Sequence, residues 1–355
     1  MNKKIVLNIE PTKENSRNSE GSFFRGLNGE IFYAYSRYNS GDFSDHASCD
    51  IALICSKDEG ETWSDFRLIA RAVDFEVKNI MCASALPLND GKLCVYFLIK
   101  ENNGTTTIGR TISCDGVNFE AERCICNMPE AYYVIENDRF IRLSDGRIAA
   151  AAAKYGNSID VTTGDGLAGI VSDNDGREFH IAGGMCRLPF DRQGSIGLEE
   201  PEIIELSENC IWILARSMYS YQYQAFSYDG MKTFTAAEPS VFSSPLSPIS
   251  LKRLSDNSII AAYNPIPNFD GRAELVGDML MEKFWSGRTP LVLRISRDNG
   301  NTWGKLHPIE NERNVDYSYP ALFETHDGGI LCAYWCVSEG NRCSMRIAKC
   351  ERIYD

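Results

Sequence analysis

The fold is decided by one short phrase, Ser-Lys-Asp-Glu-Gly-Glu-Thr-Trp at residues 56–63, which returns as Ser-Arg-Asp-Asn-Gly-Asn-Thr-Trp at residues 296–303. Three degraded copies begin at Ser113, Ser172 and Ser227, so the five copies start 57, 59, 55 and 69 residues apart. A recurring interval of this size indicates a repeated supersecondary unit. The longest interval holds an insertion at about residues 268–287, in which we expect a short helix at 273–284.

Each residue type in the phrase has a physical task. The Asp can accept hydrogen bonds from backbone amides just after it and so close a hairpin turn. The Gly adopts a backbone angle that is costly for other residues, and the final Trp or Phe can pack its ring into the core. In the third copy we match Ser172 with Asp175, Gly176 and Phe179. The phrase therefore predicts a structural turn rather than a site.

A second pattern runs out of phase with the first: an apolar run, a polar or Gly-containing turn, and another apolar run, which together predict a β-hairpin. It occurs at residues 23–35, 84–97, 139–152, 203–215, 250–263 and 321–334. We therefore predict an all-β protein, a six-bladed β-propeller of four-stranded antiparallel sheets. Residues 1–355 would form one such domain, with the N-terminal strand at 5–9 closing the last blade.

Composition narrows the function. The net charge of −13 argues against nucleic acid or an anionic membrane as a partner, and an anionic ligand would need a local group of Arg or Lys side chains. The 13 Cys residues show no metal-ligand spacing and fit buried thiols in a reducing compartment. The N-terminus reads as a strand rather than a signal peptide, and no apolar run approaches membrane-spanning length. We expect a cytoplasmic protein without a metal or cofactor, and the sequence leaves its oligomeric state open.

In a propeller the first strand of each blade lines the central channel. Counting back eight residues from each hairpin turn gives six axial positions: Glu20, Cys82, Asn137, Glu200, Pro248 and Tyr319. Two carboxyl groups, an amide and a phenol that converge on the axis predict a site there. The same alignment places Arg25 in a solvent-facing column with Arg142 and Arg253, so we do not expect Arg25 to bind a ligand.

The repeated phrase resembles the Asp box of sialidases and other propellers, and nearly the whole chain resembles the sialidase superfamily, whose members cleave terminal 2-keto-3-deoxy sugar acids. This resemblance implies that Tyr319, in Asp-Tyr-Ser-Tyr-Pro at 316–320, is the nucleophile. It implies that Glu200, in Leu-Glu-Glu-Pro at 198–201, takes the proton of Tyr319, and that Asp45 serves as the acid and base.

The resemblance also implies three Arg side chains that bind the substrate carboxylate. Arg216 and Arg288 stand where the second and third are expected, whereas Arg17 is displaced by about two residues from the expected place of the first. We count four more polar residues as candidate substrate contacts: Glu20, His46, Asn137 and Arg139.

The chemistry is consistent with these residue types. The reacting carbon carries a carboxylate, which repels an anionic nucleophile but not a neutral phenol, and a phenol with a pKa near 10 needs a base. Guanidinium groups bind carboxylates in a two-pronged manner and stay charged.

We expect an exo-acting, retaining glycoside hydrolase that acts on a small glycan or sialoside through a tyrosyl intermediate. Two alternatives stay open. One is a glycosidase of the same fold with a different sugar, which the displaced Arg17 and the added Asn137 and Arg139 would favour. The other is a propeller that binds carbohydrate without cleaving it.

Overall fold

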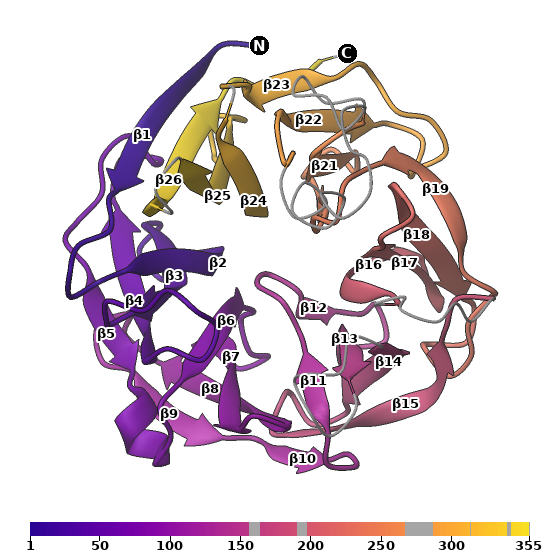
Figure 1. Ribbon diagram of the computed structural model, residues 1–355, viewed down its shortest axis with the longest axis horizontal. Helices are drawn as coiled ribbons and strands as arrows, with labels where there is room; N and C mark the ends of the chain where they lie inside the picture. The colour runs from indigo at the N-terminus through magenta and orange to yellow at the C-terminus, as the bar shows by residue number, and fades with distance from the viewer. Residues whose placement is uncertain (156–163, 190–196, 267–286, 313, 339–341, 355) are drawn as a thin grey trace, which may run out of the picture.

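The computed structural model describes residues 1–355 except 156–163, 190–196, 267–286, 313, 339–341 and 355. Its sheets follow one another in a ring around a central axis (Figure 1), which confirms the all-β propeller. The one short helix among the described residues is η1 (Ala72–Phe75), and in this part of the chain no helix is long and apolar enough to cross a membrane. The helix expected at 273–284 lies outside the described residues.

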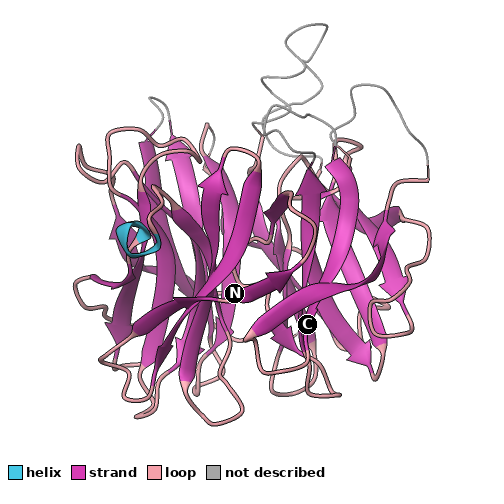
Figure 2. Ribbon diagram, turned by 90° about the horizontal axis from the view of Figure 1, so that it is seen from below, coloured by secondary structure: helices cyan, strands magenta, loops and turns pink. Residues whose placement is uncertain are grey.

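The largest sheet joins the start and the end of the chain. One half contains β2 (Arg17–Arg25), β3 (Ile31–Tyr38), β4 (Cys49–Ser56) and β5 (Arg67–Ala70). The other half contains β24 (Asp316–Glu324), β25 (Ile330–Ser338), β26 (Arg342–Cys350) and β1 (Lys3–Ile9). The halves are linked by one parallel pair, Arg17 with Cys343, and β1 pairs with β26 as predicted. Figures 1 and 2 accordingly place the two termini near each other.

Three further blades are separate four-stranded antiparallel sheets, each with its first strand toward the channel. The first contains β6 (Ile80–Ala85), β7 (Leu93–Asn102), β8 (Thr105–Ser113) and β9 (Glu120–Arg123). The second contains β16 (Glu199–Ser207), β17 (Cys210–Arg216), β18 (Tyr221–Ser227) and β19 (Glu238–Ser243). The third contains β20 (Ser250–Arg253), β21 (Ile259–Tyr263), β22 (Leu291–Ser296) and β23 (His307–Glu310).

The remaining blade departs from the predicted four strands. Its first strand is split into β11 (Tyr132–Val134) and β12 (Ile141–Arg142), which both pair with β13 (Ile148–Tyr155). Beyond β13 lie β14 (Gly164–Ser172), β15 (Glu178–Cys186) and a parallel outer strand, β10 (Ile125–Asn127). The described strands thus form five hydrogen-bonded sheets, because the β2 and β24 halves share one pair, rather than six separate four-stranded ones.

The repeated phrase folds as its chemistry requires. In the first copy the Ser56 hydroxyl accepts from the Gly60 amide at 2.8 Å, and Asp58 accepts from the Thr62 amide at 2.9 Å. The Trp63 indole donates to the Gly60 carbonyl at 3.2 Å. Each copy lies between the third and fourth strands of its blade, so the turn fixes the outer hairpin.

The third copy corrects one assignment. Asn174, not Asp175, occupies the Asp position, because its side-chain oxygen accepts from the Ser172 hydroxyl at 3.1 Å and from the Glu178 amide at 2.9 Å. Asp175 instead has a left-handed φ of 60° and forms an ion pair with Arg142 at 2.7 Å. An amide oxygen accepts hydrogen bonds as a carboxylate does, which is why the turn survives the replacement.

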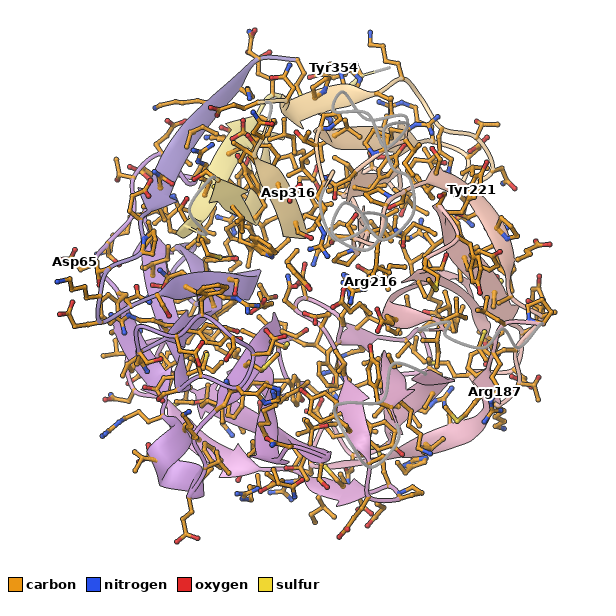
Figure 3. All side chains as sticks on the ribbon, in the orientation of Figure 1. Asp65, Arg187, Arg216, Tyr221, Asp316 and Tyr354 are labelled. Atoms are coloured by element: carbon orange, nitrogen blue, oxygen red, sulfur yellow. The ribbon has the colours of Figure 1, made fainter. Side chains whose placement is uncertain are left out.

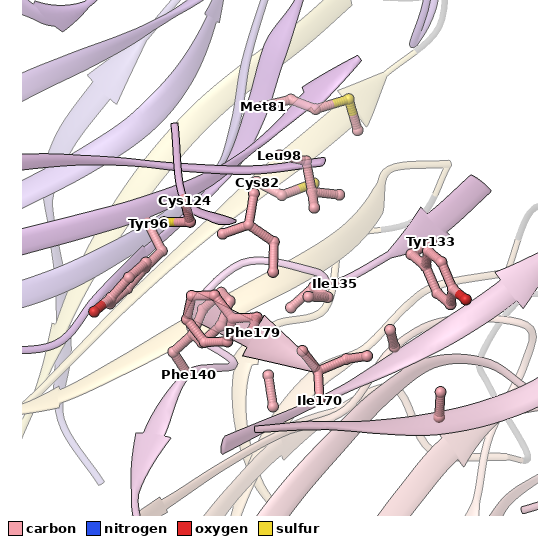
Figure 4. Packing of buried hydrophobic residues seen from close by; sticks show 14 of the residues in the cluster. Met81, Cys82, Tyr96, Leu98, Cys124, Tyr133, Ile135, Phe140, Ile170 and Phe179 are labelled. Carbon is pink, nitrogen blue, oxygen red and sulfur yellow. The ribbon is translucent and has the colours of Figure 1, made fainter. Parts of the chain in front are cut away.

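Apolar packing between neighbouring blades holds the ring together. Figure 4 shows the cluster between the β6 blade and the blade of β11 to β15, where Tyr96, Phe140 and Phe179 meet. The Tyr96 and Phe140 ring centroids are 4.7 Å apart, and Tyr96 meets Phe179 edge-on at 5.7 Å.

Arg25 lies outside the channel, as predicted, and is paired with Glu59 at 2.5 Å.

We expect Trp303→Ala to lower the free energy of unfolding by about 3 kcal/mol in urea denaturation. The ring packs edge-on against Phe242 at 4.8 Å and donates to the Gly300 carbonyl at 3.1 Å, so its loss opens a gap between two blades. Tyr354→Ala is the control, since that ring is 78% exposed and should change stability by less than about 0.5 kcal/mol. Equal effects from both variants would contradict this role for the phrase.

Candidate active site

Four of the predicted axial residues share an unusual backbone. Glu20, Cys82, Glu200 and Tyr319 have φ angles of 44°, 62°, 46° and 52°. Each lies within an irregularity of the pairing between the first and second strands of its blade. A bulge redirects a side chain, and non-glycine residues at positive φ are costly and gather at functional sites. The bulges therefore occur at the same step of four blades, where each strand meets the channel.

Three of the bulged residues, Glu20, Glu200 and Tyr319, line a cavity of about 140 Å³ at the channel. The side chains that line it come from the β2 and β24 halves of the largest sheet and from the blades of β6, β11 to β15, and β16. They are Arg17, Glu20, Asp45, Met81, Tyr132, Val134, Glu136, Tyr155, Glu200, Arg216 and Tyr319. Figure 3 places Arg216 beside the central opening. Six predicted residues thus meet in one cavity. Its volume is smaller than the roughly 300–1,000 Å³ of most ligand sites.

Tyr319 and Glu200 form the predicted contact. The Tyr319 hydroxyl on β24 donates to Glu200 Oε1 on β16 at 3.0 Å, although the two residues are 119 apart in sequence. Burial raises the pKa of Glu200 despite the opposing effect of Arg216, and burial followed by the charge of Glu200 raises the pKa of Tyr319 well above its usual value. The phenol is therefore neutral, and the carboxylate beside it is a stronger base than an exposed Glu.

Arg216 links this pair to a second tyrosine. Its guanidinium lies 2.7 Å from Glu200 Oε2 and 2.9 Å from Glu199 Oε2. The other oxygen of Glu199 accepts from the Tyr155 hydroxyl at 2.6 Å. Two tyrosine–glutamate pairs thus flank the buried Arg216. The two carboxyl groups compensate the positive charge of its guanidinium, which would be costly to bury alone.

Arg17 forms the opposite end of the cavity. Its guanidinium pairs with Glu20 and, at 2.6 Å, with Asp45, and it lies 4.6 Å from the centre of the Tyr38 ring. The Asp45 side chain is 58% exposed, at the cavity mouth. Desolvation acts to raise the pKa of Asp45, but Arg17 outweighs it and holds that pKa below its ordinary value. For Glu20 burial prevails over Arg17 and raises the pKa.

Arg288 lies behind the nucleophile candidate rather than on the cavity surface. Its guanidinium donates to Ser318 Oγ at 3.0 Å and to the Leu246 carbonyl at 2.8 Å. The guanidinium carbon is 5.8 Å from the ring centres of both Tyr319 and Trp335, which stack on each other at 5.6 Å.

Three further predicted contacts do not line the cavity. His46 is partly buried beside Asp45, and the Asn137 amide donates to the Gly21 carbonyl at 2.9 Å. Arg139 is paired with Glu202, and the two side chains are 1% and 2% exposed. Arg139 also donates to the Ile249 carbonyl at 2.8 Å, so its guanidinium joins three blades in the core.

Sequence reasoning missed Glu136, which is 4% exposed and lines the cavity. Counting from the hairpin turn fails here because residues 135–140 interrupt the strand between β11 and β12. Glu199 and Tyr155 were missed as well, although the paired carboxylates of Glu199 and Glu200 were a visible signal. In the part of the chain that the structure describes, no group of three His, Cys, Asp or Glu is placed to hold a metal ion.

Comparison with known proteins supports the fold. A family model described as a BNR repeat-like domain matches residues 33–332. A protein of unknown function from Dyadobacter fermentans superposes with a TM-score of 0.70 at 16% identity, covering 98% of this chain and 99% of that one. The NanB sialidase from Streptococcus pneumoniae gives 0.70 at 12% identity, covering 98% and 70%. No curated protein matches the sequence significantly.

A third solved structure is similar over nearly its full length. The intramolecular trans-sialidase from Ruminococcus gnavus, in complex with oseltamivir carboxylate, gives a TM-score of 0.66 at 11% identity, with 96% of each chain covered. At such identities these likenesses show the fold alone.

We expect Arg139→Met to lower the free energy of unfolding by roughly 3–5 kcal/mol, because it leaves the Glu202 carboxylate buried without its partner. The double variant Arg139→Met/Glu202→Gln should recover more than half of that loss in urea denaturation. A small loss of stability combined with weakened ligand binding would instead make Arg139 a ligand contact.

Proposed function

Since the chain belongs to the family of BNR repeat-like domains and has the propeller fold of sialidases, we propose that it is an exo-acting glycoside hydrolase for a terminal sialic acid or a related 2-keto-3-deoxy sugar acid. The observation that carries this proposal is the Tyr319–Glu200 hydrogen bond of 3.0 Å at the channel, beside the Arg216 guanidinium. A phenol beside a buried base is the nucleophile suited to a carbon that bears a carboxylate.

In the first step Tyr319 Oη forms a bond to the anomeric carbon while Glu200 accepts the phenol proton. The bond from that carbon to the leaving oxygen breaks, and Asp45 gives this oxygen a proton. In the second step Asp45 takes a proton from water, the water oxygen bonds to the anomeric carbon, and the bond to Tyr319 breaks as Glu200 returns its proton. Two displacements give net retention.

The substrate carboxylate would bind to Arg17 and Arg216, with Arg288 contributing charge from behind Tyr319. Arg17 is now occupied by Glu20 and Asp45, so a substrate carboxylate competes with Asp45 for the same guanidinium. When Arg17 turns to the substrate, Asp45 loses the contact that lowers its pKa most, so its pKa rises. Substrate binding thereby prepares Asp45 to act as an acid.

A glycosidase of the same fold with a less acidic sugar is the second candidate. Four carboxyl groups line the cavity with two guanidinium groups: Glu20, Asp45, Glu136 and Glu200 against Arg17 and Arg216. Such a lining would favour a neutral sugar if all four carboxyl groups were ionised. Turnover of a neutral glycoside that survives Arg216→Ala would select this candidate.

We expect Tyr319→Phe to lower kcat on a fluorogenic sialoside by about 10³-fold or more, since the nucleophilic oxygen is removed. Tyr317→Phe is a matched control on the same strand, because the Tyr317 ring packs against Tyr334 in the core, and this variant should keep wild-type turnover. Equal turnover in wild type and Tyr319→Phe would refute the assignment of the nucleophile. No turnover by wild type on sialic, Kdn and Kdo glycosides would refute the substrate class.

The role of Asp45 can be tested with leaving groups. We expect Asp45→Asn to slow a sialoside with a poor alkyl leaving group by about 10²–10⁴-fold, because that oxygen must be protonated as it departs. A nitrophenyl sialoside needs little protonation and should slow by less than about tenfold in the glycosylation step. Equal losses on both substrates, measured by single-turnover kinetics, would rule out Asp45 as the acid.

A further inference from the structure

Glu136 is a buried carboxyl group in the cavity that the proposed reaction does not use. It lies in the segment 135–140 between β11 and β12, and 4% of it is exposed. The cavity wall next to it in sequence comes from Tyr132 and Val134, and Met81 of β6 also lines the cavity. These side chains offer little to replace water around a carboxylate, so the wall favours the neutral form.

The surroundings of Glu136 are mostly acidic. One of its oxygens, Oε2, lies 3.5 Å from the Cys82 thiol, which is a weak donor. The ionisable groups that act on it or respond to its charge come from seven elements or segments around the channel: Cys82 on β6, Glu20 on β2, Glu200 on β16, Arg216 on β17, Tyr319 on β24, Tyr132 on β11 and Arg139 on its own segment. Burial and then the charges of Glu200 and Glu20 raise the pKa of Glu136 well above its ordinary value, against the opposing effect of the two Arg.

Binding of an anionic ligand makes the ionised form of Glu136 still less favourable. Arg216 already faces Glu199 and Glu200, and Arg17 already faces Glu20 and Asp45, so neither guanidinium leaves excess positive charge for another anion. A sugar acid that enters this cavity adds one more carboxylate within a low-dielectric space. The addition is tolerated when a nearby carboxyl group is neutral, and a neutral carboxyl group can also donate a hydrogen bond.

We propose that Glu136 is a specificity-determining residue of the site: its neutral carboxyl donates a hydrogen bond to an oxygen of the bound sugar acid, so that binding of the anion is coupled to the binding of one proton. This inference rests on the proposed function, because it takes the ligand to be a 2-keto-3-deoxy sugar acid. Glu136 takes no part in bond making or breaking.

The sign of the pH dependence follows directly. Glu136 is neutral below its raised pKa, and ligand affinity is greatest there. As pH rises through that pKa the proton must be acquired on binding, and the affinity falls by about tenfold per pH unit. From pH 5 to 8.5, the range of the test below, a Glu with an ordinary pKa would be largely ionised, whereas a Gln would be neutral.

The test is calorimetric binding of 2,3-didehydro-2-deoxy-N-acetylneuraminic acid from pH 5 to 8.5, in buffers with different ionisation enthalpies. For wild type we expect uptake of up to one proton and affinity that falls with rising pH. Glu136→Gln should bind with nearly constant affinity, and thermal melting of that variant checks its folding. Glu205→Gln is the control, because Glu205 is on β16 outside the cavity and accepts from Ser144, and it should keep the wild-type pH dependence.

Three results would overturn the inference alone: binding by wild type without a pH dependence, binding without proton uptake, or an unchanged pH dependence in Glu136→Gln. The last would assign the proton to Glu20 or Glu200. Proton uptake, measured by comparing buffers, requires only the wild-type protein. The inference can therefore be tested even if Glu136→Gln does not fold. Absence of binding by wild type to this compound and to Kdn and Kdo analogues at every pH would overturn the proposed function and this inference with it.

Discussion

The site depends on one backbone constraint, the left-handed bulge in the first strand of four blades. At Glu20, Cys82, Glu200 and Tyr319 the chain adopts positive φ angles that cost about 1–3 kcal/mol each for residues with a side chain. Regular pairing resumes after each bulge, so the ladders on either side hold the strained residue in place. The consequence is functional: the side chains of Glu20, Glu200 and Tyr319 are directed to a common cavity, and they are held by strands rather than by loops.

The second constraint is charge. Arg216 is buried and Arg17 is partly buried, and each is paired with two carboxyl groups, Arg216 with Glu199 and Glu200 and Arg17 with Glu20 and Asp45. An anionic ligand that binds to these guanidinium groups would exchange with the carboxyl groups that pair with them now. Ligand binding should therefore depend on the protonation of the cavity carboxyl groups. The cavity has more carboxyl groups than cations, and burial disfavours the ionised form of a carboxyl group such as Glu136.

The repeated phrase and the hairpin pattern were sufficient to predict the propeller, its turns and the closure by β1, because they depend on local chemistry. Counting along each blade placed Glu20, Glu200 and Tyr319 correctly for the same reason. It failed at Asn137, where the strand is interrupted, and Glu136 lines the cavity instead. It could not find the partners of Arg17 or Arg139, or the burial of Arg288 behind Tyr319, because these depend on contacts between blades that no local pattern encodes.

The most direct measurement is a crystal structure of the protein with a sialic-acid glycal bound. We expect the ligand carboxylate to replace Asp45 at Arg17 and to contact Arg216, with the anomeric carbon within about 3.5 Å of Tyr319 Oη. A ligand bound outside the channel, or one in the channel with its carboxylate directed away from both arginines, would contradict this assignment of the site.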